Sequence, residues 1–147
     1  MARMNVSRVL LGGFVAGLVI NVGEYVGSKV FAAQYEAMFA TLNLPMMSGS
    51  AMVGLVVGGF AVGIILAWLY GAIRPRFGAG PATALLAGLV VWALGWLWQT
   101  VVGEAMGLYS YSVGMWLASS AWGIVEVELA ALIAGWLYRE AESATPA

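Results

Sequence analysis

Residues 112–138, SVGMWLASSAWGIVEVELAALIAGWLY, form a long apolar run that contains two carboxylates, Glu126 and Glu128. A helix of this length covers about 40 Å, which is enough to cross a lipid bilayer. Each ionised carboxylate near the bilayer centre costs roughly 3 kcal/mol on insertion scales. At least one of the two acids must therefore be protonated, paired with another polar group, or directed towards the protein interior. The stretch predicts a membrane-spanning helix with a buried polar group.

The composition of the whole chain also indicates a membrane protein. Of its 147 residues, 63% are hydrophobic and only 9% are charged, whereas soluble domains carry roughly 25% charged residues. The net charge of −1 gives no basic surface for nucleic acid. The chain has no cysteine and no histidine, which removes disulfides and the usual zinc and haem ligands. We predict no cofactor, no metal site and no nucleic-acid partner.

Four apolar runs predict an all-α polytopic membrane protein, a bundle of four transmembrane helices that forms a single domain over residues 1–147. The expected helices cover about 8–29, 51–73, 82–102 and 112–138. Residues 30–44 are apolar but interrupted by polar side chains, so they either extend the first helix or lie in the outer interface. Residues 71–81 contain prolines and glycines, which predict a basic loop.

Two short matches suggest that the bundle contains a repeated helical hairpin. The sequence AGLV occurs at 16–19 and at 87–90, and WLY occurs at 68–70 and at 136–138. Two hairpins that enter the membrane from the same side would be related by an axis along the membrane normal. Such matches also arise by chance in chains rich in Ala, Gly and Leu.

The first helix carries one stripe of small and polar side chains. Its members, spaced by three or four residues, are Gly13, Gly17, Asn21, Glu24 and Ser28. Small residues allow close helix approach in lipid, and polar ones form hydrogen bonds across the contact. Two interpretations remain open, a packing seam with polar contacts and an ion or proton site. Val30-Phe31-Ala32 imitates a signal-peptide cleavage site, but the charged residues ahead of it argue against cleavage.

The last helix has a matching stripe, in which Glu126 lies among small residues such as Ser119 and Gly123. Glu24 lies 16 residues beyond Arg8, and Glu126 lies 13 residues before Arg139. These spacings correspond to about 24 Å and 20 Å along a helix, so the two acids are expected at similar depths.

We therefore predict a buried polar or ion site formed by side chains of three helices. Its candidate members are Asn21, Glu24, Gln99, Ser119 and Glu126. Two carboxylates at close range in a low dielectric would share a proton or hold a cation. Glu128 lies about 200° round the helix from Glu126, so we predict that it meets a different helix or another subunit.

The distribution of arginines predicts the orientation. Lys29 stands alone on one side of the four-helix topology, and five arginines fall on the other: Arg3, Arg8, Arg74, Arg76 and Arg139. By the positive-inside rule, both termini are cytoplasmic. Arg74 and Arg76 then act as a topology signal or contact lipid headgroups. An outer aromatic belt is expected from Trp96, Trp98, Tyr109, Tyr111 and Trp116.

Three stretches resemble an uncharacterised family of short bacterial four-helix membrane proteins. They are GGFVAGLVINVGEYVG at 12–27, YGAIRPRFGAGPATA at 70–84 and WGIVEVELA at 122–130. The resemblance spans most of the chain and implies a multi-pass protein of the bacterial cytoplasmic (inner) membrane. No activity is known for that family, so the resemblance transfers no site residue.

Two classes of function remain open. The first is a small integral membrane protein without a catalytic site, an accessory or assembly subunit whose polar seams dock a partner or a second copy. The second is proton- or cation-coupled translocation of a small solute by an oligomer that uses its buried carboxylates. We do not expect an enzyme, because no nucleophile–base spacing stands out. Both classes predict a homo-oligomer or a larger membrane complex.

Overall fold

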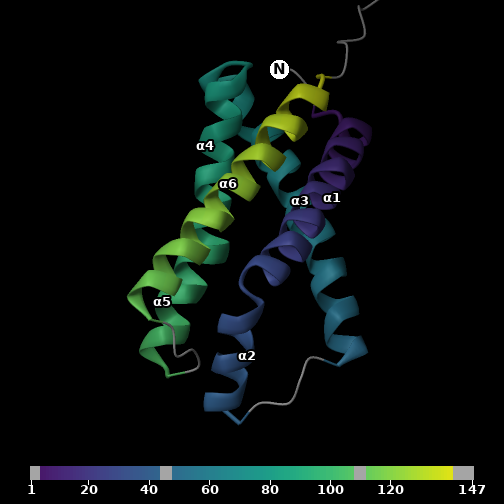
Figure 1. Cartoon of the computed structure of the whole chain (residues 1–147). Helices are drawn as coiled ribbons and strands as arrows, with labels where there is room; N and C mark the ends of the chain where they lie inside the picture. The colour runs from purple at the N-terminus through teal and green to yellow at the C-terminus, as the bar shows by residue number, and fades with distance from the viewer. Residues whose placement is uncertain (1–3, 44–47, 108–111, 141–147) are drawn as a thin grey trace, which may run out of the picture.

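The computed structural model of the chain describes residues 4–43, 48–107 and 112–140 and is helical throughout its regular parts. In chain order the segments are α1 (Val6–Val30), α2 (Ala32–Thr41), α3 (Gly49–Phe77), α4 (Pro81–Trp92), η1 (Ala93–Leu97), α5 (Trp98–Ala105) and α6 (Val113–Leu137). The π-helical segment η1 joins α4 to α5, so Pro81–Ala105 runs as one helix of 25 residues. Figure 1 shows the helices packed together as a bundle.

Four helices are long and apolar enough to cross a membrane: α1, α3, the continuous helix Pro81–Ala105 and α6. They contain 25 to 29 residues each, which corresponds to about 37–44 Å of helix. This confirms the predicted all-α fold with packed membrane spans, and the chain is a multi-pass membrane protein. The observed helix ends lie within four residues of those expected from the apolar runs.

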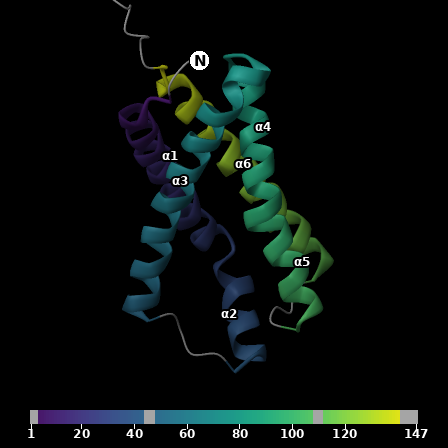
Figure 2. The same cartoon turned by 180° about the vertical axis from the view of Figure 1, so that it is seen from behind.

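The helix ends separate into two groups. The start of α1, the turn between α3 and α4, and the end of α6 lie together at what we call the arginine end (Figures 1 and 2). Helix α2, the start of α3, α5 and the start of α6 lie at the opposite end. The arginine end carries Arg8, Arg74, Arg76 and Arg139. Arg3, Tyr109 and Tyr111, which also entered the orientation argument, lie outside the described residues.

Helices α1 and α3 approach each other through glycines. A Cβ atom built on Gly63 of α3 would collide with backbone atoms of Gly13 and Gly17 of α1. Such close contact is typical of small residues at helix interfaces in lipid. The first half of α3 makes no such approach, because a Cβ at Gly54 or Gly58 would meet no atom within 4 Å. The first half of α3 is therefore largely exposed.

The connection between α3 and α4 is shorter than predicted. Helix α3 continues through Pro75 to Phe77, although the sequence predicts a loop from residue 71. Pro75 lies in the last turn, where its missing N–H removes only one helical hydrogen bond. Gly78 then ends the helix with φ +87°, a conformation that favours glycine. Thr83 Oγ1 donates a hydrogen bond to the Gly78 carbonyl at 2.8 Å, which fixes the start of α4.

Residues 32–41 form α2, which continues the path of α1 beyond a break at Phe31. Phe31 has φ −103° and ψ 18°, outside the helical region, yet its N–H still donates to the Gly27 carbonyl. Figure 1 shows α2 extending from the lower end of α1 towards the end where α3 begins. The first span and the segment after it therefore form one helix path with a single interruption.

The core of the bundle is built from small and aliphatic side chains. Ile20, Leu66 and Val127 are its largest fully buried side chains, and they come from α1, α3 and α6. Alanines fill the narrower contacts, at positions 16, 67, 84, 87, 130, 131 and 134. Close helix spacing of this kind leaves room for large polar groups only where a glycine faces them. The glycines that face polar side chains therefore mark the candidate site.

Candidate functional site

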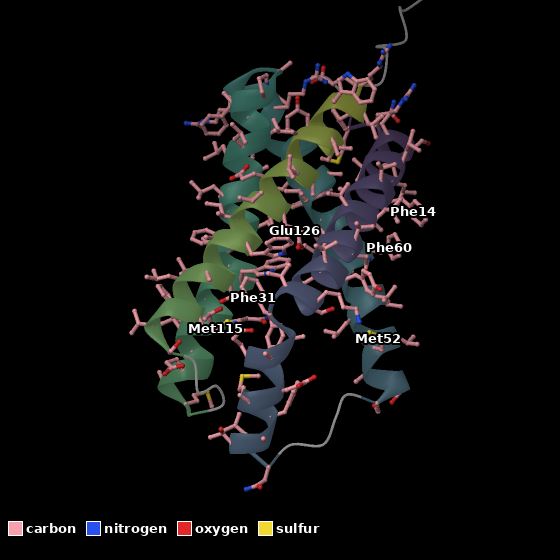
Figure 3. The ribbon with its side chains drawn as sticks, in the orientation of Figure 1. Phe14, Phe31, Met52, Phe60, Met115 and Glu126 are labelled. Atoms are coloured by element: carbon pink, nitrogen blue, oxygen red, sulfur yellow. The ribbon has the colours of Figure 1, made fainter. Side chains whose placement is uncertain are left out.

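Glu126 is the most buried acidic side chain of the bundle among the described residues. It lies in the middle of α6, its side chain is 4% exposed, and Figure 3 shows it between α6 and α1. Its carboxyl group packs directly on Gly23 of α1, where a Cβ atom would collide with Oε2. Neither carboxyl oxygen has a hydrogen-bond partner among the described residues. A glycine on the facing helix is therefore what makes space for this acid.

Glu24 follows Gly23 directly and brings a second carboxyl group to the same helix contact. Its Oε1 accepts a hydrogen bond from Trp96 Nε1 at 3.3 Å. Trp96 lies in η1, and its indole packs on Gly123, which precedes Glu126 by one helical turn. Three spans therefore contribute to one junction. The Glu24 side chain is exposed in the single chain, so the junction is open on the side of α1.

Aromatic side chains border the two acids. Trp122 of α6 donates from Nε1 to the Gly23 carbonyl at 3.2 Å, and the ring of Phe31 meets the Trp122 ring edge-on at 6.1 Å between centroids. Burial raises the pKa of the Tyr35 phenol in α2, and the carboxylates of Glu24 and Glu126 raise it further. The Tyr35 ring also meets the Phe31 ring edge-on, at 6.5 Å between centroids, so Tyr35 continues this aromatic border. We call Glu24, Glu126, Trp96, Trp122 and Tyr35 the paired-acid site.

The paired-acid site contains no positively charged group that could balance its two acids. Its titratable members are two carboxyl groups and a phenol, none of which carries a positive charge. Lys29, in the last turn of α1, places its ammonium 5.4 Å from the centroid of the Tyr25 ring. The one ion pair among the described residues joins Arg74 to Glu140 at the arginine end. Two adjacent carboxyl groups in low dielectric are stable only when protons or a bound cation offset their charge.

Asn21 does not join the acids. Its amide Nδ2 donates to the Gly17 carbonyl at 2.8 Å and to the Val56 carbonyl of α3 at 3.2 Å. A Cβ at Gly59 of α3 would collide with the Asn21 side chain, so this residue occupies a glycine notch on α3. Asn21 is thus a satisfied polar contact between α1 and α3. The predicted stripe on α1 is divided between two neighbouring helices.

Gln99 and Ser119 also lie apart from the two acids. Gln99 is exposed on α5. Ser119 donates its hydroxyl to the Trp116 carbonyl at 3.1 Å within α6, a bond that does not reach another helix. Of the five predicted site members, the structure brings together Glu24 and Glu126, and it directs Asn21, Gln99 and Ser119 elsewhere.

Glu128 occupies the opposite side of α6 and contacts α4 of the same chain. Its carboxyl group packs on Gly88, where a Cβ atom would lie 2.5 Å from Oε2. That oxygen is buried without a hydrogen-bond partner, although the side chain as a whole is only partly buried. The prediction allowed a different helix or another subunit, and the described contact is with a different helix.

The two arginines of the α3–α4 connection behave differently. Arg74 is half-buried, forms the ion pair with Glu140 at 3.6 Å, and lies 5.5 Å from the centroid of the Tyr138 ring. Arg76 is exposed. Arg74 thereby ties the end of α3 to the end of α6, whereas Arg76 remains available to headgroups or solvent.

Trp96 and Trp122 are site residues that the sequence reasoning missed. Trp96 was expected in an outer aromatic belt, yet it donates to Glu24. Trp122 lies near the middle of α6. A tryptophan at mid-span was the available signal, because an indole N–H in lipid needs an acceptor. Glycines at 23 and 123, beside the two acids in sequence, were a second signal.

Comparisons with protein-family models, with curated proteins and with solved structures found no match for this chain. No family is therefore identified, and the resemblance of the three stretches adds nothing beyond the architecture of a small four-helix membrane protein. Among the described residues, no group of three or more acidic side chains could hold a metal ion. The chemistry of the site has to be argued from its own residues.

Proposed function

We propose that the chain is a small integral membrane protein whose paired-acid site binds a proton or a cation, as one step of solute translocation by an oligomer. The observation that carries this proposal is the Glu126 carboxyl group, which is 4% exposed and has no hydrogen-bond partner among the described residues. Acidic side chains inside membrane proteins face protein or water, and they often mark ion or proton pathways.

A purely structural role accounts poorly for Glu126. Buried polar atoms in native proteins nearly always have a hydrogen-bond partner, because an unpaired one costs about 1–3 kcal/mol. Asn21 illustrates the structural alternative in the same helix, since its amide is satisfied by α1 and α3. Glu126 has glycine on one side and a second acid nearby instead. A carboxyl group that binds and releases a ligand needs oxygens that no other hydrogen bond occupies.

The exposure of Glu24 suggests an entry side for the ligand. Glu126 is buried, whereas Glu24 of the same site is exposed in the single chain and is held by one hydrogen bond from Trp96. A ligand that first meets Glu24 could pass to Glu126 without crossing the packed core. Four helices enclose little space for a pathway, so we expect that further copies complete it.

A second candidate function is an accessory or assembly subunit of a larger membrane complex. The exposed first half of α3 favours it, because Gly54 and Gly58 meet no atom within 4 Å and form a small-residue face. Co-purification separates the two candidates. A stoichiometric complex with larger proteins supports an accessory subunit, and a self-contained oligomer supports translocation.

We also propose a bacterial cytoplasmic membrane location with both termini in the cytoplasm. The support is the clustering of Arg8, Arg74, Arg76 and Arg139 at one end of the bundle. Arginines of short loops are enriched on the cytoplasmic side. Lys29, at the far end of α1, is the one lysine of the chain.

Reaction with dicyclohexylcarbodiimide tests the proposed proton or cation site. This hydrophobic reagent modifies protonated carboxyl groups in apolar surroundings, and peptide mass spectrometry locates the product. We expect modification at Glu126 that falls as the pH is raised and falls when a bound cation displaces the proton. Glu36 of α2 is the internal control, because it is exposed and the reagent should modify it less than buried Glu126. Failure to modify Glu126 at any pH contradicts the proposal.

A further inference from the structure

We infer that the cation taken by the paired-acid site is an organic ammonium with an apolar substituent, because two carboxyl groups are set there among Trp96, Trp122 and Tyr35. This inference rests on the proposed function, of which it names the ligand class. It is argued from the ligand atoms that the site offers, from its aromatic border and from its charge.

The site offers too few oxygen ligands for a bare metal ion. Small metal cations bind six or more oxygens, and potassium filters replace the whole hydration shell with rings of carbonyls. Here the oxygens on offer are those of Glu126 and Glu24, and Glu24 Oε1 already accepts from Trp96. The Gly23 carbonyl already accepts from Trp122, the Asn21 amide is directed to α3, and the Ser119 hydroxyl is bonded within α6.

The aromatic border suits an organic cation. Tryptophan and tyrosine rings attract ammonium groups through cation–π interactions, which strengthen when water is excluded. Trp96 donates to Glu24, Trp122 donates to the carbonyl beside it, and Phe31 packs edge-on against Trp122. These contacts hold the rings next to the acids. An apolar substituent on the ligand would find aromatic surface there.

Charge balance predicts an exchange of one proton for one cation. Two protonated carboxyl groups are neutral, and so are one carboxylate, one carboxylic acid and one ammonium. Binding of the ammonium with release of one proton therefore leaves no net charge in the low dielectric. The proton comes from a carboxyl O–H bond, and the ammonium forms an ion pair with the carboxylate that remains.

Only the two acids take part in this exchange of a proton for a cation, because the other titratable groups around the site are neutral or face elsewhere. On α1 the nearest cation is Lys29, and on α2 Tyr35 has a raised pKa, so its phenol stays neutral at ordinary pH. Glu36 of α2 is exposed, and Glu128 faces α4 on the other side of α6. Helix α4 and η1 contain no titratable side chain, and those of α3 lie in its last two turns at the arginine end.

Isothermal titration calorimetry of the purified full chain in mild detergent tests the inference. The probe is benzyltrimethylammonium, and the matched control is neopentylbenzene, its uncharged isostere. Titration in two buffers of different ionisation enthalpy gives the number of protons released. We expect the ammonium to bind with release of one proton and the isostere not to bind. Because this comparison uses the wild-type chain, it does not depend on the folding of any variant.

Variants assign the binding to the paired-acid site. We expect at least about tenfold weaker ammonium binding in Glu126→Gln, and a similar loss in Trp122→Leu, which removes a bordering ring. Glu128→Gln is the matched control, because that acid faces α4, and its affinity should stay within about twofold of wild type. Equal binding of the ammonium and its isostere, or equal loss in Glu128→Gln, overturns the inference.

Carbodiimide modification of Glu126 separates failure of the inference from failure of the proposed function. Protection of Glu126 by sodium or potassium ions, without protection by benzyltrimethylammonium, overturns the organic ligand and leaves the proposed cation site standing. If no cation protects Glu126 and none binds, both are overturned. Protection by benzyltrimethylammonium at concentrations where sodium has no effect supports both.

Discussion

Glu126 of α6 packs on Gly23 of α1, so closely that a Cβ atom at position 23 would overlap its Oε2. The contact places a buried acid beside Glu24, which follows Gly23 in the chain. Only glycine leaves this space, so the position of the Glu126 carboxyl group depends on Gly23. The account of the paired-acid site rests on this relationship.

Substitution Gly23→Ala should displace the Glu126 side chain. Overpacking of a tight contact typically costs about 1–3 kcal/mol, so the thermal unfolding temperature in mild detergent should fall. Gly54→Ala is the matched control on α3, because a Cβ there meets no atom within 4 Å. That control should be neutral or stabilised by roughly 0.5–1 kcal/mol, since alanine favours a helix over glycine. Equal behaviour of the two variants would argue against the Gly23–Glu126 contact.

Cysteine pairs test whether the two acids approach each other. The natural chain has no cysteine, so Glu24→Cys with Glu126→Cys introduces the only reactive pair. A disulfide requires α carbons within about 7 Å, and a short-spacer cross-linker extends the range. We expect intramolecular cross-linking, seen as a mobility shift in denaturing gels. The control pair is Glu24→Cys with Glu128→Cys, which should react less because Glu128 faces α4. The reverse order of reactivity would refute the arrangement.

Glu128 should affect assembly more than ligand binding. Its carboxyl group packs on Gly88 with one buried oxygen unpaired, yet the side chain is partly exposed in the single chain. We expect Glu128→Gln to shift the oligomer size in mild detergent, because a half-exposed acid in lipid favours a partner. Size-exclusion chromatography with light scattering measures the shift. An unchanged profile would count against a role of Glu128 in assembly.

Topology is tested by reporter fusions. We expect fusions at position 76 and at the C-terminus both to report cytoplasm, because the arginines of the described chain gather at the end where position 76 lies and where α6 ends. A fusion after residue 107, at the opposite end, is the control and should report the outer side. A non-cytoplasmic signal at position 76 would contradict the proposed orientation.

The architecture was predictable because membrane spans follow from length and apolar character alone. Four apolar runs of the sequence became four long helices, with ends within four residues of those expected. The largest difference is at the end of α3, which continues through Pro75 to Phe77 where a loop over 71–81 was expected. Proline and glycine predict a break, but the helix ends only at Gly78, after Pro75 has removed one hydrogen bond near its end. Local composition therefore misplaced that helix end.

The site was only partly accessible from the sequence. Similar depth and matching stripes pointed to Glu24 and Glu126 together, but Asn21 shares the stripe and turns to α3. A stripe defines one side of a helix, and α1 has neighbours on both α3 and α6. Trp96 was missed because η1 is a π-helical segment. The wider turn of a π-helix changes the face on which its residues lie, so a regular helical wheel does not predict the position of Trp96.

Infrared difference spectroscopy of the full chain tests the central claim most directly. A protonated carboxylic acid has a carbonyl band that is separate from those of carboxylates and amides, and comparison with Glu126→Gln assigns it. The account predicts protonated carboxyl absorption near neutral pH, of which the component assigned to Glu126 is absent in Glu126→Gln, unchanged in Glu128→Gln, and lost when benzyltrimethylammonium is added. A wild-type spectrum without any protonated carboxyl band assignable to Glu126, in the absence of a bound cation, would contradict it.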